Sequence, residues 1–139
     1  AVLLDAAGTA TRSTLHVWGG EPTVSLAGAG ADASGGRLQE LALAAAEAVH
    51  GAAVAGDAAA HRVTLLAGST DGRDGPTDAA GALVDAHTWT RIVAARRDPA
   101  ADLARHRSHA ALAAADALLA GGPTGTNVAD VVLALVTAG

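Results

Sequence analysis

Short apolar runs along the chain alternate with stretches in which apolar residues recur at helical spacing. The runs that predict strands are residues 15–18, 23–27, 63–67 and 131–136. The first two flank the turn sequence Gly19, Gly20, Glu21 and Pro22, so they predict an antiparallel hairpin. Residues 79–84 fit either a strand or a helix.

Helical spacing is clearest from residue 36 to about residue 50, and Ser34 is placed to cap that helix. Residues 87–97, 99–106 and 108–119 also predict helices, whereas glycine-rich loops are expected at 28–36, 68–78 and 121–127. Because strands and helices alternate, we expect one three-layer-like α/β domain with a mixed sheet flanked by helices. The sheet should be antiparallel at the first hairpin and parallel across later crossovers.

Composition narrows the class of protein. The chain has 139 residues, enough for one core, and no cysteine, which excludes disulfides and thiolate metal sites. Its formal charge is −5 and its nine cationic side chains, all arginine, form no basic stripe, which argues against a nucleic-acid partner. No apolar run approaches the roughly 20 residues that cross a bilayer, and the opening residues lack the order of a signal peptide. We therefore expect a cytoplasmic protein without a membrane partner.

Four loops combine glycine with polar side chains, at residues 19–21, 34–37, 68–78 and 121–127. Turn preferences explain any one of them, but four in a small domain favour loops whose backbone N–H groups approach an anion. Arg37 lies in the first turn of its helix, where the helix dipole disfavours a cation. Such an arginine makes a phosphate or carboxylate clamp, although a solvated surface arginine fits equally well.

The sequence evidence for a metal site is weaker than that for an anion-binding site. Asp71, Asp74 and Asp78 follow a predicted strand, the usual place for ligands in α/β sheets, and carboxylates suit Mg²⁺. His106 and His109 have the spacing of two metal ligands, but a solvated helix face accounts for them better. The chain has no lysine, so a lysine of the kind that phosphoryl-transfer sites commonly use would have to come from elsewhere.

Four strings together resemble a known family. They are GGEPTV (19–24), GGRLQELALA (35–44), STDGRDGPTDAAGA (69–82) and GPTGTNVAD (122–130). In this order and spacing they resemble the MOFRL domain, the C-terminal domain of glycerate 2-kinases, a family that also carries the name hydroxypyruvate reductase. The resemblance covers about residues 15–136 of a domain spanning 1–139, and it implies that the four loops converge on one side of the sheet.

The resemblance implies an enzyme that transfers the γ-phosphoryl group of ATP to the 2-hydroxyl of D-glycerate, or a related hydroxy acid, with Mg²⁺. Its site would lie in a cleft against a larger N-terminal Rossmann-like domain or subunit that is not part of this sequence. Two positions depart from the family pattern: Leu38 stands where asparagine is usual, and Arg107 stands where an acidic residue is common.

Site residues follow from the same resemblance. Arg37 would be the catalytic cation, and Asp71 and Asp74 would be metal ligands. The phosphate- and substrate-binding residues would be Gly19, Gly20, Glu21, Gly35, Gly36, Gln39, Glu40, Thr70, Asp71, Gly72, Asp74, Gly75, Thr77, Asp78, Thr124, Gly125, Thr126 and Asn127.

Two functions stay open at this point. The chain is part of a glycerate 2-kinase, which a large flat apolar face would support, or it is a stand-alone, non-catalytic anion- or nucleotide-binding module. A purely structural role ranks last, because it gives no reason for the four loops.

Overall fold

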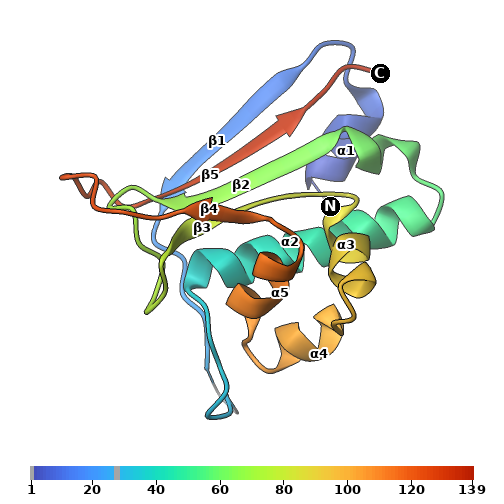
Figure 1. The fold of residues 1–139 in the computed structure, drawn as a ribbon. Helices are drawn as coiled ribbons and strands as arrows, with labels where there is room; N and C mark the ends of the chain where they lie inside the picture. Colours follow the sequence, from blue (N-terminus) through green and yellow to red (C-terminus); the bar gives the residue numbers. More distant parts are fainter. Residues whose placement is uncertain (1, 27–28) are drawn as a thin grey trace.

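The computed structural model describes residues 2–26 and 29–139, so the parts of the predicted strand 23–27 and loop 28–36 at residues 27 and 28 lie outside the described residues (Figure 1). The strands are β1 (Thr14–Gly20), β2 (Val63–Ser69), β3 (Ala79–Asp85), β4 (Leu118–Ala120) and β5 (Asp130–Val136). The helices are α1 (Val2–Thr9), α2 (Arg37–Val54), the 3₁₀ helix η1 (Ala58–Arg62), α3 (Thr88–Ala94), α4 (Pro99–Ala104) and α5 (Ser108–Ala114).

The strands form one sheet in the order β1-β5-β2-β3-β4, and each neighbouring pair is antiparallel. The predicted α/β class, a sheet flanked by helices, is confirmed, but the mixed sheet is wrong. β1 and β2 do run in the same direction on either side of the crossover helix α2. β5 lies between them and is antiparallel to both, so this crossover does not produce a parallel pair.

The predicted hairpin at residues 15–27 does not form. β1 pairs along its whole length with β5 instead, and β5 is a longer apolar strand than the short segment after Pro22. Proline has no N–H to give to a strand ladder. The described part of the expected second strand, residues 23–26, accordingly lies outside the sheet.

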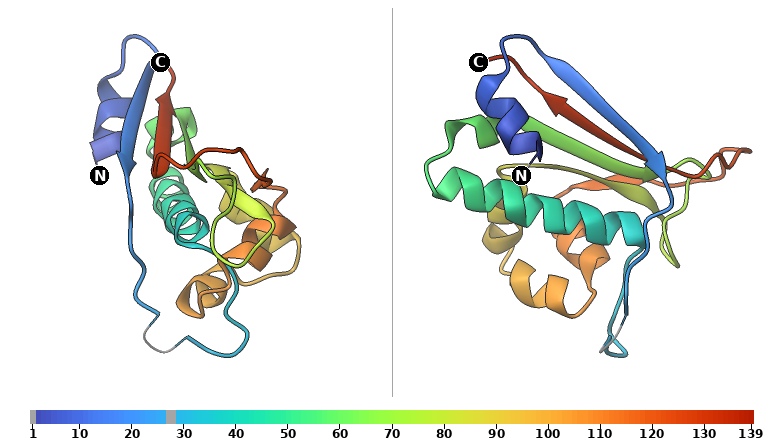
Figure 2. Two further views of the ribbon diagram at one scale, coloured as in Figure 1. Left: turned by 90° about the vertical axis from the view of Figure 1, so that its left-hand side faces the viewer. Right: turned by 180° about the vertical axis from the view of Figure 1, so that it is seen from behind.

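The helices pack on one face of the sheet, which makes two layers rather than three. Seen from behind, α1 and α2 both lie in front of the strands (Figure 2). Alternate strand residues point toward these helices, so Leu65, Val84 and Ala134 are buried together with Leu43 of α2 and Leu112 of α5. Many of the remaining core residues are alanines, so α2 packs closely on the sheet.

The opposite face of the sheet carries aliphatic side chains that the described helices leave uncovered. Leu15 and Val17 of β1, Leu83 of β3 and Leu135 of β5 are between 41% and 61% exposed. Leu15 lies opposite Leu135 in the ladder, so the patch continues from strand to strand. Apolar patches of this kind are common where a protein surface packs against another molecule.

Most helix predictions are confirmed, with two corrections. The three later helices correspond to α3, α4 and α5, but α5 ends at Ala114 and residues 118–120 form the edge strand β4. Asp116 separates them in a left-handed conformation, with φ of 52°. Ser34 does not cap α2, since the residue before that helix is Gly36. Across residues 2–26 and 29–139, no helix combines the length and apolarity needed to cross a membrane.

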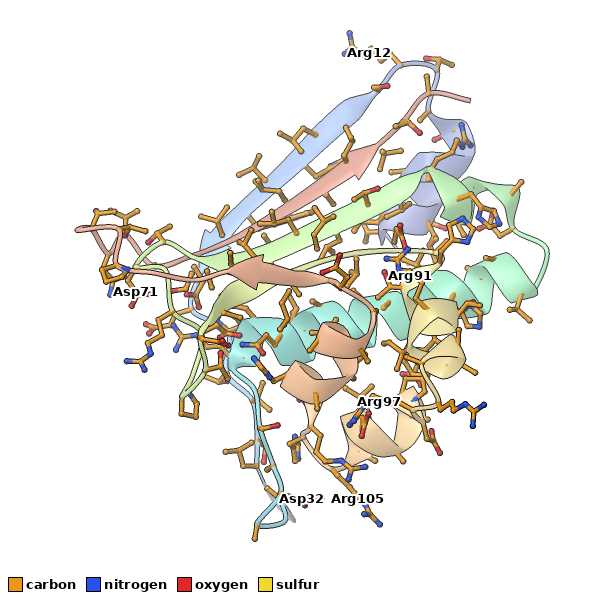
Figure 3. The ribbon with its side chains drawn as sticks, in the orientation of Figure 1. Arg12, Asp32, Asp71, Arg91, Arg97 and Arg105 are labelled. Carbon is orange, nitrogen blue, oxygen red and sulfur yellow. The ribbon has the colours of Figure 1, made fainter. Side chains whose placement is uncertain are left out.

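The glycine-polar loops meet at one edge of the sheet, as the sequence predicts. β1, β2 and β4 end at this edge, and α2, β3 and β5 begin there (Figure 1). Asp71 marks the edge in Figure 3, far from Arg12 at the other end of β1. The carboxyl ends of β1, β2 and β4 and the N-terminus of α2 therefore share one surface. We call this surface, formed by the loops at 19–21, 34–37, 68–78 and 121–127, the loop edge.

Candidate functional site

The N-terminus of α2 is capped from a distant loop. Both carboxylate oxygens of Asp74 accept hydrogen bonds from its first turn, Oδ1 from the N–H of Leu38 at 3.1 Å and Oδ2 from the N–H of Gln39 at 2.8 Å. Asp74 is buried, and a carboxylate is favoured at the positive end of the helix dipole. This capping role replaces the metal-ligand role predicted for Asp74.

Gly35 and Gly36 allow close packing around this cap. A Cβ on Gly36 would overlap the carboxyl group of Asp74, and a Cβ on Gly35 would overlap Oγ of Ser108. Gly35 also has φ of +145°, a conformation that side chains rarely adopt. The Gly-Gly pair therefore lets two neighbouring segments close on the start of α2.

Gln39 and Thr77 extend the contact between α2 and the loop at 69–78. The side-chain amide of Gln39 donates to the carbonyl oxygen of Asp74 at 3.1 Å and to Oγ1 of Thr77 at 2.9 Å. Glu40, the next residue, lies 2.8 Å from Nδ1 of His106. Both predicted binding residues on α2 thus have protein partners that fix the loops in place.

Arg37 is held by a buried carboxylate that the sequence analysis missed. Its Nε donates to Oδ2 of Asp130 at 2.6 Å and its Nη2 donates to Oδ1 at 3.1 Å. The Asp130 side chain is 2% exposed and that of Arg37 is 40% exposed. Glu21 approaches Nη2 from the solvent side at 3.5 Å. The hydrogen bond to Asp130 raises the pKa of Arg37 above its ordinary value, so this group is a permanent cation.

Thr70 ties the loop after β2 to the loop before β5. Its Oγ1 donates to the carbonyl oxygen of Ala129 at 2.7 Å, and Oγ1 of Thr124 donates to the carbonyl oxygen of Thr70 at 2.6 Å. Asn127 accepts from the N–H of Ala129 at 3.2 Å. These contacts hold Ala129 at φ of 72°, a strained conformation for alanine, directly before Asp130.

Asp71 and Asp78 are charged carboxylates of the same loop. Asp71 accepts from the N–H of Arg73 and from Oγ of Ser69, both at 2.9 Å, and these bonds lower its pKa. Asp78 lies 3.0 Å from Nε2 of His109, a contact that lowers its pKa. Both carboxylates line the second of the two cavities at this end of the sheet.

The described residues do not form a metal site by themselves. Nowhere in residues 2–26 and 29–139 do three His, Cys, Asp or Glu side chains gather around one point. His106 and His109 pair with different carboxylates, and Asp74 is used as a helix cap. Asp71 still has one carboxylate oxygen without a protein partner in the described structure. It therefore fits the part of a single protein ligand beside substrate phosphates, which is how Mg²⁺ is often held.

Two cavities open at this edge. The first has a volume of about 450 Å³, and its lining includes Gly36, Arg37, Glu40 and His106. The second has a volume of about 400 Å³, and its lining includes Asp71, Arg73, Asp78 and Gly122. The first cavity combines Arg37 with the glycine backbone at residues 35 and 36, which suits an anionic group. The second cavity sets the carboxylates of Asp71 and Asp78 against one arginine, Arg73.

The predicted site residues divide between structural and accessible positions. Those that build the loop edge are Gly35, Gly36, Gln39, Glu40, Thr70, Gly72, Asp74, Gly75 and Thr77. Those that lie at the surface of the edge are Gly19, Gly20, Glu21, Arg37, Asp71, Asp78, Thr124, Gly125, Thr126 and Asn127. Leu38 is fully buried in the core, so its departure from the family pattern changes the packing and not the cavity. Arg107 pairs with Asp102 and Asp32.

Sequence reasoning did not name Asp130 or Ser108 as site residues, and it considered His106 only as a weak metal-ligand candidate. Asp130 closes the string GPTGTNVAD at the start of an apolar run, where a lone acid signals a polar partner on a neighbouring element. His106 lies between α4 and α5, and Ser108 is the first residue of α5, where the sequence gave no signal of a cavity.

The fold agrees with the comparisons with known proteins. The MOFRL family matches residues 14–130. The chain therefore belongs to the MOFRL family. It is 45% identical over 120 residues to the D-glycerate 2-kinase of Thermotoga maritima, covering 86% of this chain and 26% of that protein. It is 42% identical to the glycerate 2-kinase of Pyrococcus horikoshii, covering 87% of this chain and 25% of that one.

Solved structures give the same result. The crystal structure of the glycerate kinase from Thermotoga maritima superposes with a TM-score of 0.82 at 36% identity, covering 98% of this chain and 31% of that chain. A Pyrococcus horikoshii protein gives a TM-score of 0.75 at 34% identity, over 99% of this chain and 30% of that one. The chain thus spans about a quarter of the length of the curated relatives it matches.

Proposed function

We propose that this chain is the C-terminal domain of a glycerate 2-kinase and binds phosphate or substrate during ATP-dependent phosphorylation of D-glycerate to 2-phosphoglycerate. The observation that carries the proposal is the fixed cation Arg37, which lies beside the glycine-rich loops at 19–21, 34–37 and 68–78. Relatives that share this domain are glycerate 2-kinases.

Arg37 is suited to an anionic reactant. D-glycerate, 2-phosphoglycerate and ATP all carry carboxylate or phosphate groups, and a guanidinium binds these through charge-assisted hydrogen bonds. Nη1 of Arg37 has no hydrogen-bond partner among the described residues, and it lies at the N-terminus of α2 beside the larger cavity.

ATP would be the second substrate, and Mg²⁺ would neutralise phosphate charge when bound. Within this chain Asp71 is the residue that fits a role as metal ligand. The chain has no lysine, so a lysine for the transferred phosphate would come from the rest of the enzyme. The proposal includes a cytoplasmic location, where ATP is available.

The uncovered sheet face supports a larger assembly. Its exposed leucines and valines would be protected if another domain packed there, and the relatives are about four times as long as the matched region. The stand-alone binding module has no comparable support, because the relatives carry this domain as part of a kinase.

Titration of the chain with 2-phosphoglycerate, followed by ¹⁵N NMR, tests the proposal. We expect shifts at the backbone of Gly36 and at Nε of Arg37, and none at Gly51 near the other end of α2. Arg37→Ala should reduce the shift at Gly36 at the same ligand concentration. If D-glycerate, 2-phosphoglycerate and Mg-ATP all leave these resonances unchanged, the proposed site is wrong.

A further inference from the structure

The contact between Arg37 and Asp130 is a two-point pairing. It uses the Nε–H and one N–H of Nη2, at 2.6 and 3.1 Å from the two carboxylate oxygens. A guanidinium is planar and carries five N–H groups in fixed directions. Because two of them are held, the directions of the other three are fixed, including both N–H groups of Nη1.

Asp130 is itself held rigidly. It is the first residue of β5 and pairs with Gly20 of β1 on one side and with Ser69 of β2 on the other. The residue before it, Ala129, is fixed by Thr70, so the backbone of Asp130 cannot shift easily. The carboxylate is a firm anchor for a longer and more exposed side chain.

A buried carboxylate here does not increase attraction for anions. Asp130 cancels the charge of Arg37, and Glu21 adds a further negative charge nearby at 3.5 Å. A site that relied on positive charge alone would be better without Asp130. A site that must offer N–H groups in one direction gains from it, because an ordered arginine loses less conformational entropy when a ligand binds.

We infer that Asp130 is a positioning residue, which sets the edge of the Arg37 guanidinium that meets the anionic reactant. The inference rests on the proposed function, since it takes Arg37 as the cation that binds a phosphate or carboxylate. It assigns a role to a residue outside the loops that carry the other predicted contacts.

This role is tested by whether the Asp130→Asn variant binds 2-phosphoglycerate more weakly or more tightly than the wild type. Asp130→Asn keeps the size of the side chain and removes its negative charge. If Asp130 only balanced charge, the variant would bind 2-phosphoglycerate more tightly, because the site becomes more positive. If Asp130 positions Arg37, the variant binds at least fivefold more weakly despite the gain in positive charge. Calorimetric titration of the whole chain measures the dissociation constant.

Matched variants separate the possible causes. Asp85→Asn also removes a carboxylate paired with an arginine, Arg91, which lies on α3 away from the loop edge (Figure 3), and it should leave the dissociation constant unchanged. In an Arg37→Ala background, Asp130→Asn should change the residual affinity less than twofold, since no guanidinium remains to be positioned.

Folding of each variant is checked by its thermal unfolding curve. If Asp130→Asn does not fold, Arg37→Lys provides a second measurement that can overturn the role, because lysine keeps the charge but cannot make the two-point contact with Asp130. Arg37→Lys should bind at least fivefold more weakly. Wild-type affinity in either folded variant, or tighter binding by Asp130→Asn, overturns the positioning role while leaving the proposed function standing. A wild-type chain that binds no 2-phosphoglycerate overturns both.

Discussion

The carboxylate of Asp74 occupies the space beside Gly36 and caps α2 with both of its oxygens, across 36 residues of sequence from Leu38. This contact decides where the longest helix begins and brings the loop at 69–78 to the same place. The geometry of the whole loop edge depends on it, because Arg37 is the first residue of that helix.

Asp74→Ala should lower the free energy of unfolding by about 2–4 kcal/mol, because two buried N–H groups lose their acceptor at the helix N-terminus. Asp98→Ala is the control, since Asp98 caps the short helix α4 with one exposed bond to Ala101 and should cost about 1 kcal/mol. Urea unfolding measures both. Equal losses of unfolding free energy in the two variants would show that the buried cap contributes no more than an exposed one.

Gly36→Ala should destabilise the fold by at least about 2 kcal/mol, since the new Cβ overlaps the Asp74 carboxyl group and the cap has to move. Gly51→Ala, in the same helix, meets nothing within 4 Å. It should stabilise the chain by about 0.5–1 kcal/mol through helix propensity. Thermal unfolding compares them, and a stable Gly36→Ala protein would mean that the loop packs less tightly than described.

Arg37→Ala should cost about 1–3 kcal/mol of stability, because it leaves the buried Asp130 carboxylate without its partner while opening a path for water. The double variant Arg37→Ala/Asp130→Asn should recover at least half of the loss, since the buried charge is gone. Denaturant unfolding of the three proteins checks this. A double variant less stable than Arg37→Ala contradicts the idea of an unpaired buried charge.

Low pH should weaken the hydrogen bonds that Asp85 accepts at the start of α3. Burial acts to raise the pKa of Asp85, but hydrogen bonds from Thr88, Arg91 and the N–H of His87 outweigh it and lower the pKa. A lowered pKa gives stability that is present above the unfolded value of about 3.9 and is lost as the pH falls through the folded value.

Wild type should therefore be more stable than Asp85→Asn at pH 7, and the difference should shrink below about pH 4. Urea unfolding at a series of pH values from 7 to 2 measures it. A difference that stays constant over this range would show that the charge of Asp85 does not contribute.

Local pattern predicts the individual elements well and their pairing poorly. The apolar run at 63–67 and the helical spacing after residue 36 predict β2 and α2, because each period lies within the segment itself. The hairpin failed because β5, from the far end of the chain, takes the place beside β1. The periodicity of one strand does not reveal which other strand will lie next to it.

The candidate site shows the same limit. Glycine-rich strings located the loops, and the resemblance located Arg37, but the partner of Arg37 lies 93 residues away. Asp74 has the chemistry of a metal ligand, and only the fold shows that its oxygens are used by α2. The residue type shows which groups could bind a ligand. The tertiary contacts decide which of those groups are already used by the protein itself.

The chain alone should not phosphorylate D-glycerate. Phosphoryl transfer needs groups on both sides of the transferred phosphate, and a site with one side open to water weakens each electrostatic contact. A coupled assay with ATP, Mg²⁺ and D-glycerate should show no turnover above background. Turnover by the purified chain would mean that residues 1–139 hold a complete site.

A chimera puts the proposed role of this domain to a direct test. The matching segment of the Thermotoga maritima D-glycerate 2-kinase, about a quarter of that protein, is replaced by this chain, and ATP-dependent formation of 2-phosphoglycerate is measured. We predict activity in the chimera and a loss of at least tenfold when it carries Arg37→Ala. A chimera that folds with the melting behaviour of the parent enzyme and forms no product would contradict the proposal.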